Sequence, residues 1–235
     1  MKSLRDIFWS LPKFADKWDP YFDVYETWFA KFRNHSPRIL EIGVQNGGSA
    51  DMWVEYFGPG TQVVGVDIDP RCLQHTSDSV EIVIGDQGNE VFWKSFFESH
   101  PEPFDIIIDD GSHQMIDMAL TFSIASKHVR DGGIYLVEDC HTAYWTDASI
   151  YYGDVTTRGI YNPRNFVEFT KVGLDVLNRK HMTDYPQVPQ LATELVKMFE
   201  HIKATHYYDS MVVYEVGATK PFTRCLNSGA RMQDT

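Results

Sequence analysis

Short apolar runs and amphipathic stretches alternate along the chain from residue 38 onward. The apolar runs predict strands over residues 38–44, 62–68, 80–85, 104–109 and 133–137. Apolar positions follow one another in these runs instead of alternating with polar ones, which is typical of strands buried on both faces. The stretches between them predict helices over residues 49–56, 90–98 and 115–129, the last ended by Asp131-Gly132-Gly133. This order indicates an α/β fold, with a mostly parallel sheet that helices cover on both faces.

The pattern changes after residue 139. Residues 140–165 are aromatic and polar, a stretch too long for an ordinary connecting loop and typical of a lid or binding segment. Helices are predicted over residues 166–179 and 190–201. The stretches on either side of a short Asp209-Ser210 turn predict two strands that form a hairpin over residues 204–217.

The length of 235 residues favours one domain over residues 1–235. The aromatic-rich residues 1–35 are expected to form a helical flap that packs on the sheet, and residues 36–139 its core. The remaining parts are a lid at 140–165, helices and the hairpin at 166–217, and a tail at 218–235.

Composition narrows the partners and the compartment. The chain has 21 Lys and Arg against 33 Asp and Glu, a net charge of −12, which disfavours nucleic acid and acidic membrane surfaces as partners. The apolar runs are too short to span a membrane, and residues 1–14 lack the features of a signal peptide. Cys72, Cys140 and Cys225 indicate neither a disulfide framework nor a zinc site. We therefore expect a cytoplasmic protein.

A glycine-rich turn links the first predicted strand to the first predicted helix. It reads EIGVQNGGS over residues 41–49, and its glycines let the backbone approach a ligand closely at a helix N-terminus. Asp67 ends the next strand, where a carboxylate can accept both hydroxyl protons of a ribose. Together they indicate an adenosine-type cofactor, although a glycine-rich turn also occurs in other doubly wound proteins. The spacing of Gly43 and Gly47 is not the dinucleotide fingerprint, which disfavours a nicotinamide or flavin enzyme.

These residues resemble the class I S-adenosylmethionine-dependent methyltransferases. The resemblance covers about residues 36–217 and implies a Rossmann-like sheet of seven strands with an antiparallel C-terminal hairpin. It implies that the loop at 43–48 passes the methionine part of the cofactor, that Asp67 holds the ribose, and that Asp86 and Gln87 lie beside the adenine. An alternative for Asp86 is a helix cap. The residues assigned to the cofactor are Glu41, Gly43, Gly47, Gly48, Ser49, Asp67, Asp86, Gln87 and Asp109.

Four acids are expected to meet at the ends of two neighbouring strands. Asp109 and Asp110 lie in IIIDDGSH, which also holds His113, and Glu138 and Asp139 lie in LVEDCH. Neighbouring strands are roughly 4.8 Å apart, so the acids reach one crevice, where their mutual repulsion favours a bound Mg²⁺ or Mn²⁺. The alternative is a set of helix-capping and solvated acids without a metal.

The same residues resemble the metal-dependent sugar O-methyltransferases of the macrolide and rhamnosyl type, which are grouped with cephalosporin hydroxylase-like proteins. The segment DKWDPYFDVYE at 16–26 resembles the one that precedes the core in these enzymes. The resemblance implies that Asp110, Glu138 and Asp139 ligate the metal and that Asp109 faces the amino group of the cofactor. It also implies that His113, beside Asp110 in the catalytic site, is the general base. A structural histidine is the alternative reading of His113.

An acceptor platform is expected in residues 140–165. Its candidates are Tyr144, Trp145, Tyr151, Tyr152 and Tyr161, since aromatic rings stack on sugars, with His141 and Tyr21 as further candidates. The alternative is that these rings pack under a lid.

We therefore predict a divalent-metal-dependent O-methyltransferase that transfers the methyl group of S-adenosylmethionine to a sugar or glycan hydroxyl. The acceptor is a sugar, a nucleotide sugar or a glycan, and the sequence leaves open which hydroxyl is methylated and whether the chain forms a homo-oligomer. Two alternatives stay open: a catechol-like or natural-product O-methyltransferase, and a non-catalytic cofactor-binding module. A hydroxylase is disfavoured because the two-histidine, one-carboxylate motif is missing.

Overall fold

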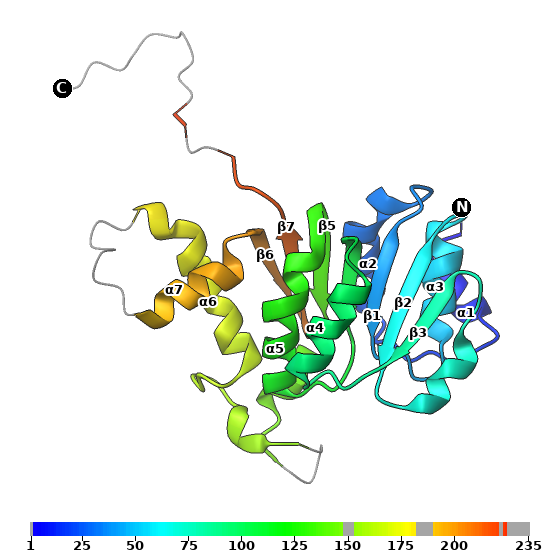
Figure 1. Cartoon of the computed structure of the whole chain (residues 1–235), viewed down its shortest axis with the longest axis horizontal. Helices are drawn as coiled ribbons and strands as arrows, with labels where there is room; N and C mark the ends of the chain where they lie inside the picture. The colour runs from blue at the N-terminus through cyan, green and yellow to red at the C-terminus, as the bar shows by residue number, and fades with distance from the viewer. Residues whose placement is uncertain (1, 148–152, 182–189, 221–222, 225–235) are drawn as a thin grey trace.

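A seven-stranded sheet has the order β3-β2-β1-β4-β5-β7-β6 (Figure 1). The computed structural model of the chain describes residues 2–147, 153–181, 190–220 and 223–224. The strands are β1 (Arg38–Ile42), β2 (Gln62–Asp67), β3 (Val80–Ile84), β4 (Phe104–Asp109), β5 (Val129–Val137), β6 (Ile202–Tyr208) and β7 (Met211–Val216). Strands β1 to β5 pair in parallel, whereas β7 runs antiparallel to β5 and β6. The predicted sheet with its antiparallel C-terminal hairpin is confirmed.

Seven α-helices are seen in the described residues. They are α1 (Leu4–Ser10), α2 (Tyr21–Phe29), α3 (Gly48–Phe57), α4 (Glu90–Ser99), α5 (Met115–Ala125), α6 (Phe166–Asn178) and α7 (Gln190–Phe199). Short 3-10 turns accompany them: η1 (Ala30–Phe32), η2 (Pro70–His75), η3 (Ser126–His128), η4 (Cys140–Tyr144), η5 (Val155–Thr157) and η6 (Arg179–His181). Among these helices, none has both the length and the apolar character that crossing a bilayer requires.

Both faces of the sheet carry a hydrophobic core. Leu40 and Ile107 point to the face where side chains of α4, α5, α6 and α7 pack, and Figure 1 shows α4 and α5 in front of the strands. Their neighbours Ile39 and Ile106 point to the other face, where α1, α2 and α3 pack. Successive side chains of a strand point to opposite faces, so the continuous apolar runs follow from burial on both sides. Each fully buried aliphatic side chain stabilises the fold by roughly 1.5–3 kcal/mol.

The largest difference from the predicted boundaries lies between α5 and β5. The helix expected over residues 115–129 ends at Ala125, and β5 already begins at Val129. Val129 pairs with Phe104, after which the register shifts. Gly132, with a φ of 82°, lies in this irregular part of β5 and not at a helix end. Because a helix C-terminus and a strand irregularity both favour glycine in this conformation, the pattern alone could not separate them.

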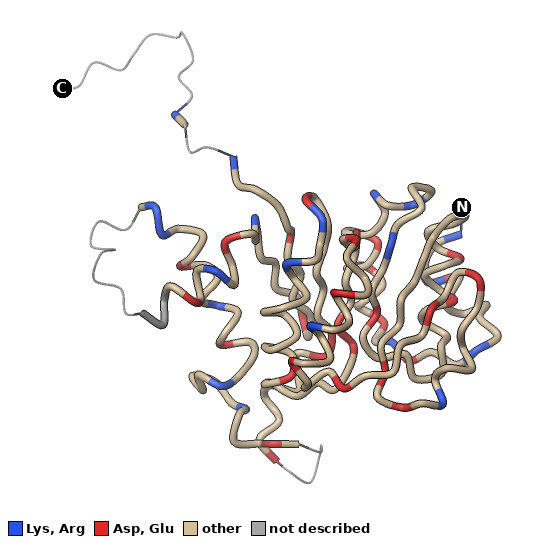
Figure 2. The backbone as a smooth tube through the Cα atoms, viewed as in Figure 1, with Lys and Arg blue, Asp and Glu red and all other residues tan. Residues whose placement is uncertain are grey.

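The register of the parallel strands brings several strand ends to one level. Ile42 pairs with Val66 on one side and with Asp109 on the other, and Asp109 pairs with Val137. The next residue along each of these strands is Gly43, Asp67, Asp110 and Glu138. Strand order reverses around β1, and open α/β sheets bind ligands at such a point. Acidic positions are frequent along the lower edge of the view in Figure 2, where the parallel strands end.

Candidate active site

The loop between β1 and α3 packs closely against two other segments. A Cβ atom at Gly43, where φ is +92°, would lie 2.0 Å from the carbonyl oxygen of Asp110. A Cβ atom at Gly48 would lie 2.2 Å from the carbonyl oxygen of Phe14, so the N-terminal segment crosses the start of α3. Only glycine permits these approaches. The loop therefore lies against both Asp110 and the N-terminal segment at Phe14. The free N–H groups at the N-terminus of α3 lie beside it.

Asp67 lies at the end of β2 and holds this loop from the side. Its Oδ2 accepts hydrogen bonds from the backbone N–H groups of Val44 (2.8 Å) and Gln45 (3.0 Å), and its Oδ1 accepts one from Asp69 (2.9 Å). Partial burial opposes ionisation, but these backbone donors hold the pKa of Asp67 below its usual value. The carboxylate is therefore ionised and retains lone pairs for a further donor.

A cavity of about 790 Å³ extends along the strand ends. Its wall includes the predicted residues Gly43, Gly48, Ser49, Asp67, Asp110, His113, Glu138, Asp139, His141, Trp145 and Tyr21. Residues 14–18 of the N-terminal segment form a further part of the wall. The volume lies in the range of 300–1,000 Å³ that is usual for small-molecule sites.

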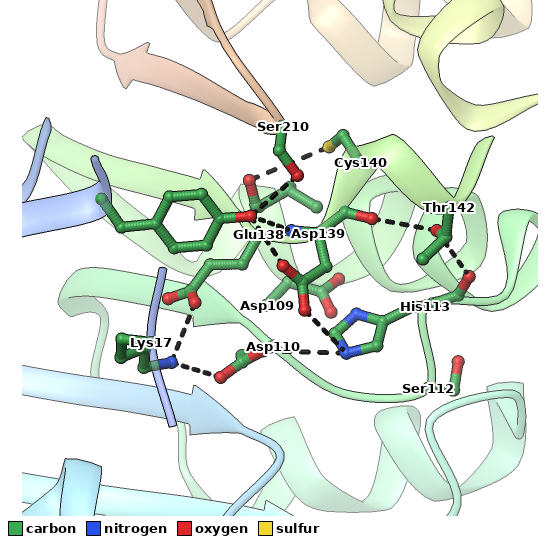
Figure 3. A network of polar contacts seen from close by, with 12 residues as sticks. Lys17, Asp109, Asp110, Ser112, His113, Glu138, Asp139, Cys140, Thr142 and Ser210 are labelled. Carbon is green, nitrogen blue, oxygen red and sulfur yellow. Dashed lines mark hydrogen bonds and ion pairs between the residues drawn. The ribbon is translucent and has the colours of Figure 1, made fainter. Parts of the chain in front are cut away.

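Lys17 lies among the acids at this cavity. Its Nζ is 2.8 Å from Oε2 of Glu138 and also contacts Oδ2 of Asp110, and its side chain is 2% exposed (Figure 3). Burial alone would lower the pKa of a lysine, but the carboxylates of Asp110, Glu138 and Glu41 raise the pKa of Lys17 above its usual value. Lys17 is therefore a buried positive charge within a group of carboxylates.

Two tyrosines of α2 donate hydrogen bonds to the acids that follow β5. The hydroxyl of Tyr25 donates to Oε1 of Glu138 at 2.7 Å. The hydroxyl of Tyr21 donates to Oδ1 of Asp139 at 2.6 Å and lies 2.7 Å from Oγ of Ser210. Burial and the nearby carboxylates raise the pKa of both phenols, so both keep their protons and act as donors.

His113 completes a cluster with Asp110 and Asp139. Its Nε2 is 3.8 Å from Oδ1 of Asp110 and 3.5 Å from Oδ2 of Asp139 (Figure 3). One ligand atom of each residue lies within 4.8 Å of the others. Two carboxylate oxygens, both partly accessible to water, fit a hard divalent ion such as Mg²⁺ or Mn²⁺, and the imidazole nitrogen of His113 lies beside them. Glu138, the third predicted ligand, is directed to Lys17 and Tyr25, and the ligand assignments stay predictions.

Two members of this cluster have an uncommon backbone conformation. The φ angles of His113 and Asp139 are +52° and +53°, in the left-handed region that residues other than glycine rarely adopt. The hydroxyl of Thr142 donates to the carbonyl of His113 at 3.3 Å and links the two segments. Such conformations cost free energy and concentrate at functional sites.

Several predicted cofactor residues lie behind the cavity wall. Asp109 is 1% exposed, and it accepts hydrogen bonds from Nε2 of Gln87 (2.7 Å) and from the hydroxyl of Tyr135 (3.2 Å). Oε1 of Gln87 accepts the backbone N–H of Ser112 at 2.7 Å. Burial raises the pKa of Asp109 to about 7. These side chains connect β4 to the loop after β3.

The remaining predicted cofactor residues are also engaged with protein groups. Glu41 is buried and accepts a hydrogen bond from Nε1 of Trp53 at 2.8 Å, and burial raises its pKa to about 7. Asp86 accepts the backbone N–H of Gly88 at 2.8 Å. Gly47 packs against the ring of His75. Their contact with a cofactor stays a prediction.

An aromatic group lines part of the cavity. The rings of Trp18 and His141 meet edge-on at 5.8 Å between centroids, and those of His141 and Trp145 lie 4.8 Å apart. Nδ1 of His141 also contacts Oγ of Ser210, at the hairpin turn. Trp18 is 59% exposed, so part of its ring is available to a ligand. Of the other predicted aromatics, Tyr144 and Tyr161 are exposed and are not part of this wall, and Tyr151 and Tyr152 lie outside the described residues.

Sequence reasoning missed the roles of Lys17, Trp18, Tyr25 and Ser210. The first three lie in the segment 16–26, whose resemblance to the segment that precedes the core in sugar O-methyltransferases implies no role for these residues. The spacing of Tyr21 and Tyr25, four apart, could have shown that they share a helix face. No local pattern indicates that Ser210 faces the same site from the hairpin turn.

Two relatives of similar sequence are O-methyltransferases, the class that the sequence motifs predict. No family model matches the chain. The chain is 35% identical over 181 residues to 8-demethyl-8-alpha-L-rhamnosyl tetracenomycin-C 2'-O-methyltransferase of Streptomyces olivaceus, covering 73% of this chain and 44% of that enzyme. It is 38% identical over 129 residues to mycinamicin VI 2''-O-methyltransferase of Micromonospora griseorubida, covering 52% and 31%. The chain thus spans about half or less of the length of these relatives.

One solved methyltransferase structure resembles the chain in fold as well as in sequence. MycE, a methyltransferase of the mycinamycin biosynthetic pathway solved in complex with Mg and SAH, superposes with a TM-score of 0.77 and 27% identity. The match covers 92% of this chain and 55% of that one. Over the part that it spans, the chain is related in sequence and in fold to class I S-adenosylmethionine-dependent methyltransferases of the macrolide and rhamnosyl O-methyltransferase type.

Proposed function

We propose that the protein is an S-adenosylmethionine-dependent O-methyltransferase that needs Mg²⁺ or Mn²⁺ and methylates a sugar hydroxyl. One observation carries the proposal: oxygens of Asp110 and Asp139 converge with Nε2 of His113 on the wall of a cavity that Asp67 also lines. A cofactor site and an ion site in one cavity are what metal-assisted methyl transfer requires. The names of the relatives support a sugar as acceptor.

The cofactor is proposed to lie along the loop after β1. Gly43, Gly48 and Ser49 line the cavity directly, and the carboxylate of Asp67 would accept the two ribose hydroxyls. The residues that would support this wall from behind are Glu41, Gly47, Gln87 and Asp109. Asp86 would lie near the adenine. When bound, S-adenosylmethionine supplies a methyl group on a positively charged sulfur, which suits an acidic cavity.

The divalent ion is proposed to be held by the acids at the ends of β4 and β5. Asp110 and Asp139 each direct an oxygen toward the cluster, and Glu138 is the third proposed ligand. An ion at this position would lower the pKa of a hydroxyl that it coordinates and would orient it. The carboxylates also fix where an acceptor can approach, so much of the rate would come from positioning.

His113 is the proposed general base. Its side chain lines the cavity and is 14% exposed, so Nε2 can reach a bound acceptor. Nε2 takes the hydroxyl proton while the acceptor oxygen forms a bond to the methyl carbon and the carbon–sulfur bond breaks, leaving S-adenosylhomocysteine. Asp139, 3.5 Å from this nitrogen, would stabilise the imidazolium that forms.

The acceptor is proposed to be a sugar, free or attached to a larger molecule such as a natural product. Trp145 and His141, with Trp18, would present ring faces and edges to the apolar side of the sugar. Tyr21 lies on the same wall, and Tyr144 is exposed nearby in sequence. A glycan chain or a nucleotide sugar would use the same hydroxyl chemistry.

The test is methyl transfer from labelled S-adenosylmethionine to a panel of acceptors, with and without EDTA. The panel contains rhamnosides, rhamnosylated polyketides, nucleotide sugars, oligosaccharides and a catechol. We expect label on a sugar hydroxyl, with loss of transfer on chelation and recovery on addition of Mg²⁺. Transfer to the catechol alone, or transfer that EDTA does not affect, would contradict the proposal.

A further inference from the structure

We propose that Lys17, Tyr21 and Tyr25 are positioning residues that hold the acids of the ion site from the N-terminal side. The two tyrosine hydroxyls fix the orientation of Asp139 and Glu138, and the lysine ammonium balances the charge of the acids until a divalent ion binds. This inference rests on the ion site in the proposed function.

In both Asp139 and Asp110, the two carboxylate oxygens have different partners. Oδ1 of Asp139 accepts from Tyr21, whereas its Oδ2 is directed to His113. Oδ2 of Asp110 contacts Lys17, whereas its Oδ1 is directed to His113. One oxygen of each acid is therefore held by the N-terminal segment, and the other is left facing the cluster.

The tyrosines can hold the acids because their own rings are fixed. Tyr21 and Tyr25 are 2% and 0% exposed, and their rings pack edge-on at 6.3 Å. Tyr25 also packs on Trp53 at 5.2 Å. Groups that orient metal ligands from behind typically change metal affinity by about 10–100-fold when they are removed. A hydroxyl on such a fixed ring limits the directions that its carboxylate can take.

Lys17 is expected to weaken ion binding, whereas the two tyrosine hydroxyls strengthen it. Its buried ammonium contacts Asp110 and Glu138, two of the proposed ligands, and so repels a divalent cation that approaches the same oxygens. Loss of this charge would leave Glu138 with one unpaired oxygen at a site that attracts cations. Removal of Lys17 should therefore favour ion binding, whereas removal of either hydroxyl should weaken it.

The test is Mn²⁺ binding, followed by electron paramagnetic resonance, to the full chain and to Tyr21→Phe, Tyr25→Phe and Lys17→Met. Two matched controls make the same chemical change elsewhere. The hydroxyl of buried Tyr56 donates to Glu26 at 2.7 Å, and Lys13 pairs with Asp51, so the controls are Tyr56→Phe and Lys13→Met. Thermal unfolding and affinity for S-adenosylhomocysteine are measured for every variant, to show that each is folded.

We expect both tyrosine variants to bind Mn²⁺ about 10–100-fold more weakly, Lys17→Met to bind about tenfold more tightly, and both controls to match the wild-type chain. Opposite signs within one segment cannot arise from a general loosening of that segment. Equal affinities in all variants, or parallel weakening that follows the loss of thermal stability, would overturn the inference while leaving the ion site intact. A wild-type chain that binds no Mn²⁺ would overturn the ion site and this inference together. If Tyr25→Phe fails to fold, Tyr21→Phe and Lys17→Met alone show whether the two kinds of residue change the Mn²⁺ affinity in opposite directions.

Discussion

Nζ of Lys17 lies 2.8 Å from Oε2 of Glu138, although 121 positions separate the two residues in the chain. The strand ends alone would place the acids of β4 and β5 side by side with a strong mutual repulsion. The buried ammonium offsets part of this repulsion within the protein. The N-terminal segment is thus a component of the candidate site as well as of the hydrophobic core.

Replacement of His113 by alanine shows whether His113 is a general base or a metal ligand. As the general base, His113 contributes to proton removal, so His113→Ala should lower turnover by about 10²–10⁴-fold with unchanged affinity for Mn²⁺ and S-adenosylhomocysteine. Single-turnover kinetics and Mn²⁺ titration measure both quantities, and His100→Ala, at a histidine that contacts Glu81, is the control. Unchanged turnover would exclude the base, and a loss of Mn²⁺ affinity would make His113 a ligand.

Replacement of Asp67 by asparagine should weaken cofactor binding. The carboxylate can accept two ribose hydroxyls, and hydrogen bonds to a charged group contribute about 1.5–3 kcal/mol each, so we expect at least tenfold weaker binding. Calorimetry with S-adenosylhomocysteine measures the effect. Asp51→Asn, at a carboxylate that pairs with Lys13 and does not line the cavity, should bind like the wild-type chain. Equal affinities for Asp67→Asn and the control would place the ribose elsewhere.

Glu41 makes folding stability depend on pH. Burial raises its folded pKa to about 7 from the usual 4.5, so the folded protein binds the proton more tightly than the unfolded chain. The contribution of this group to stability is complete below pH 4.5 and decreases as the pH rises from about 4.5 through 7. Thermal unfolding between pH 5 and 8 should show a falling midpoint, and Glu41→Gln should reduce the slope. Identical slopes for both proteins would contradict the assignment.

The aromatic wall makes a prediction about the acceptor. Trp145→Ala and Trp18→Ala remove rings that line the cavity, and an aromatic contact contributes about 0.5–1.5 kcal/mol beyond its buried area. We expect each variant to raise the KM for the sugar acceptor by about three- to tenfold, with a smaller change in kcat. Trp9, 77% exposed and not part of the cavity wall, gives the control Trp9→Ala. An unchanged KM in both Trp145→Ala and Trp18→Ala would remove the acceptor from this wall.

The sequence predicted most of the sheet because its strands are buried on both faces. Continuous apolar runs such as the one at β4 leave few other structures possible. The hairpin was identified by the Asp209-Ser210 turn between two strand-forming stretches, although most of β6 is exposed or half-buried. The end of α5 could not be predicted, because the left-handed glycine at 132 serves a strand irregularity. Boundaries depend on tertiary pairing, which a local pattern does not contain.

The candidate site could be predicted only where its residues follow strands. Gly43 and Asp110 come directly after a strand, Asp67 is the last residue of one, and parallel register brings them to one level. Lys17 reaches the acids through the packing of α2 on the sheet, a contact between distant segments that no motif spacing encodes. The ion pair, the tyrosine contacts and the turn at Ser210 therefore required the structure.

Anomalous diffraction from crystals grown with Mn²⁺ and S-adenosylhomocysteine shows whether Asp110 and Asp139 hold a divalent ion beside the cofactor. We expect one strong Mn²⁺ peak at coordination distance from carboxylate oxygens of both Asp110 and Asp139, with the nucleoside beside Asp67 in the adjoining cavity. A peak held by other residues, or a bound nucleoside with no ion between those two carboxylates, would contradict it.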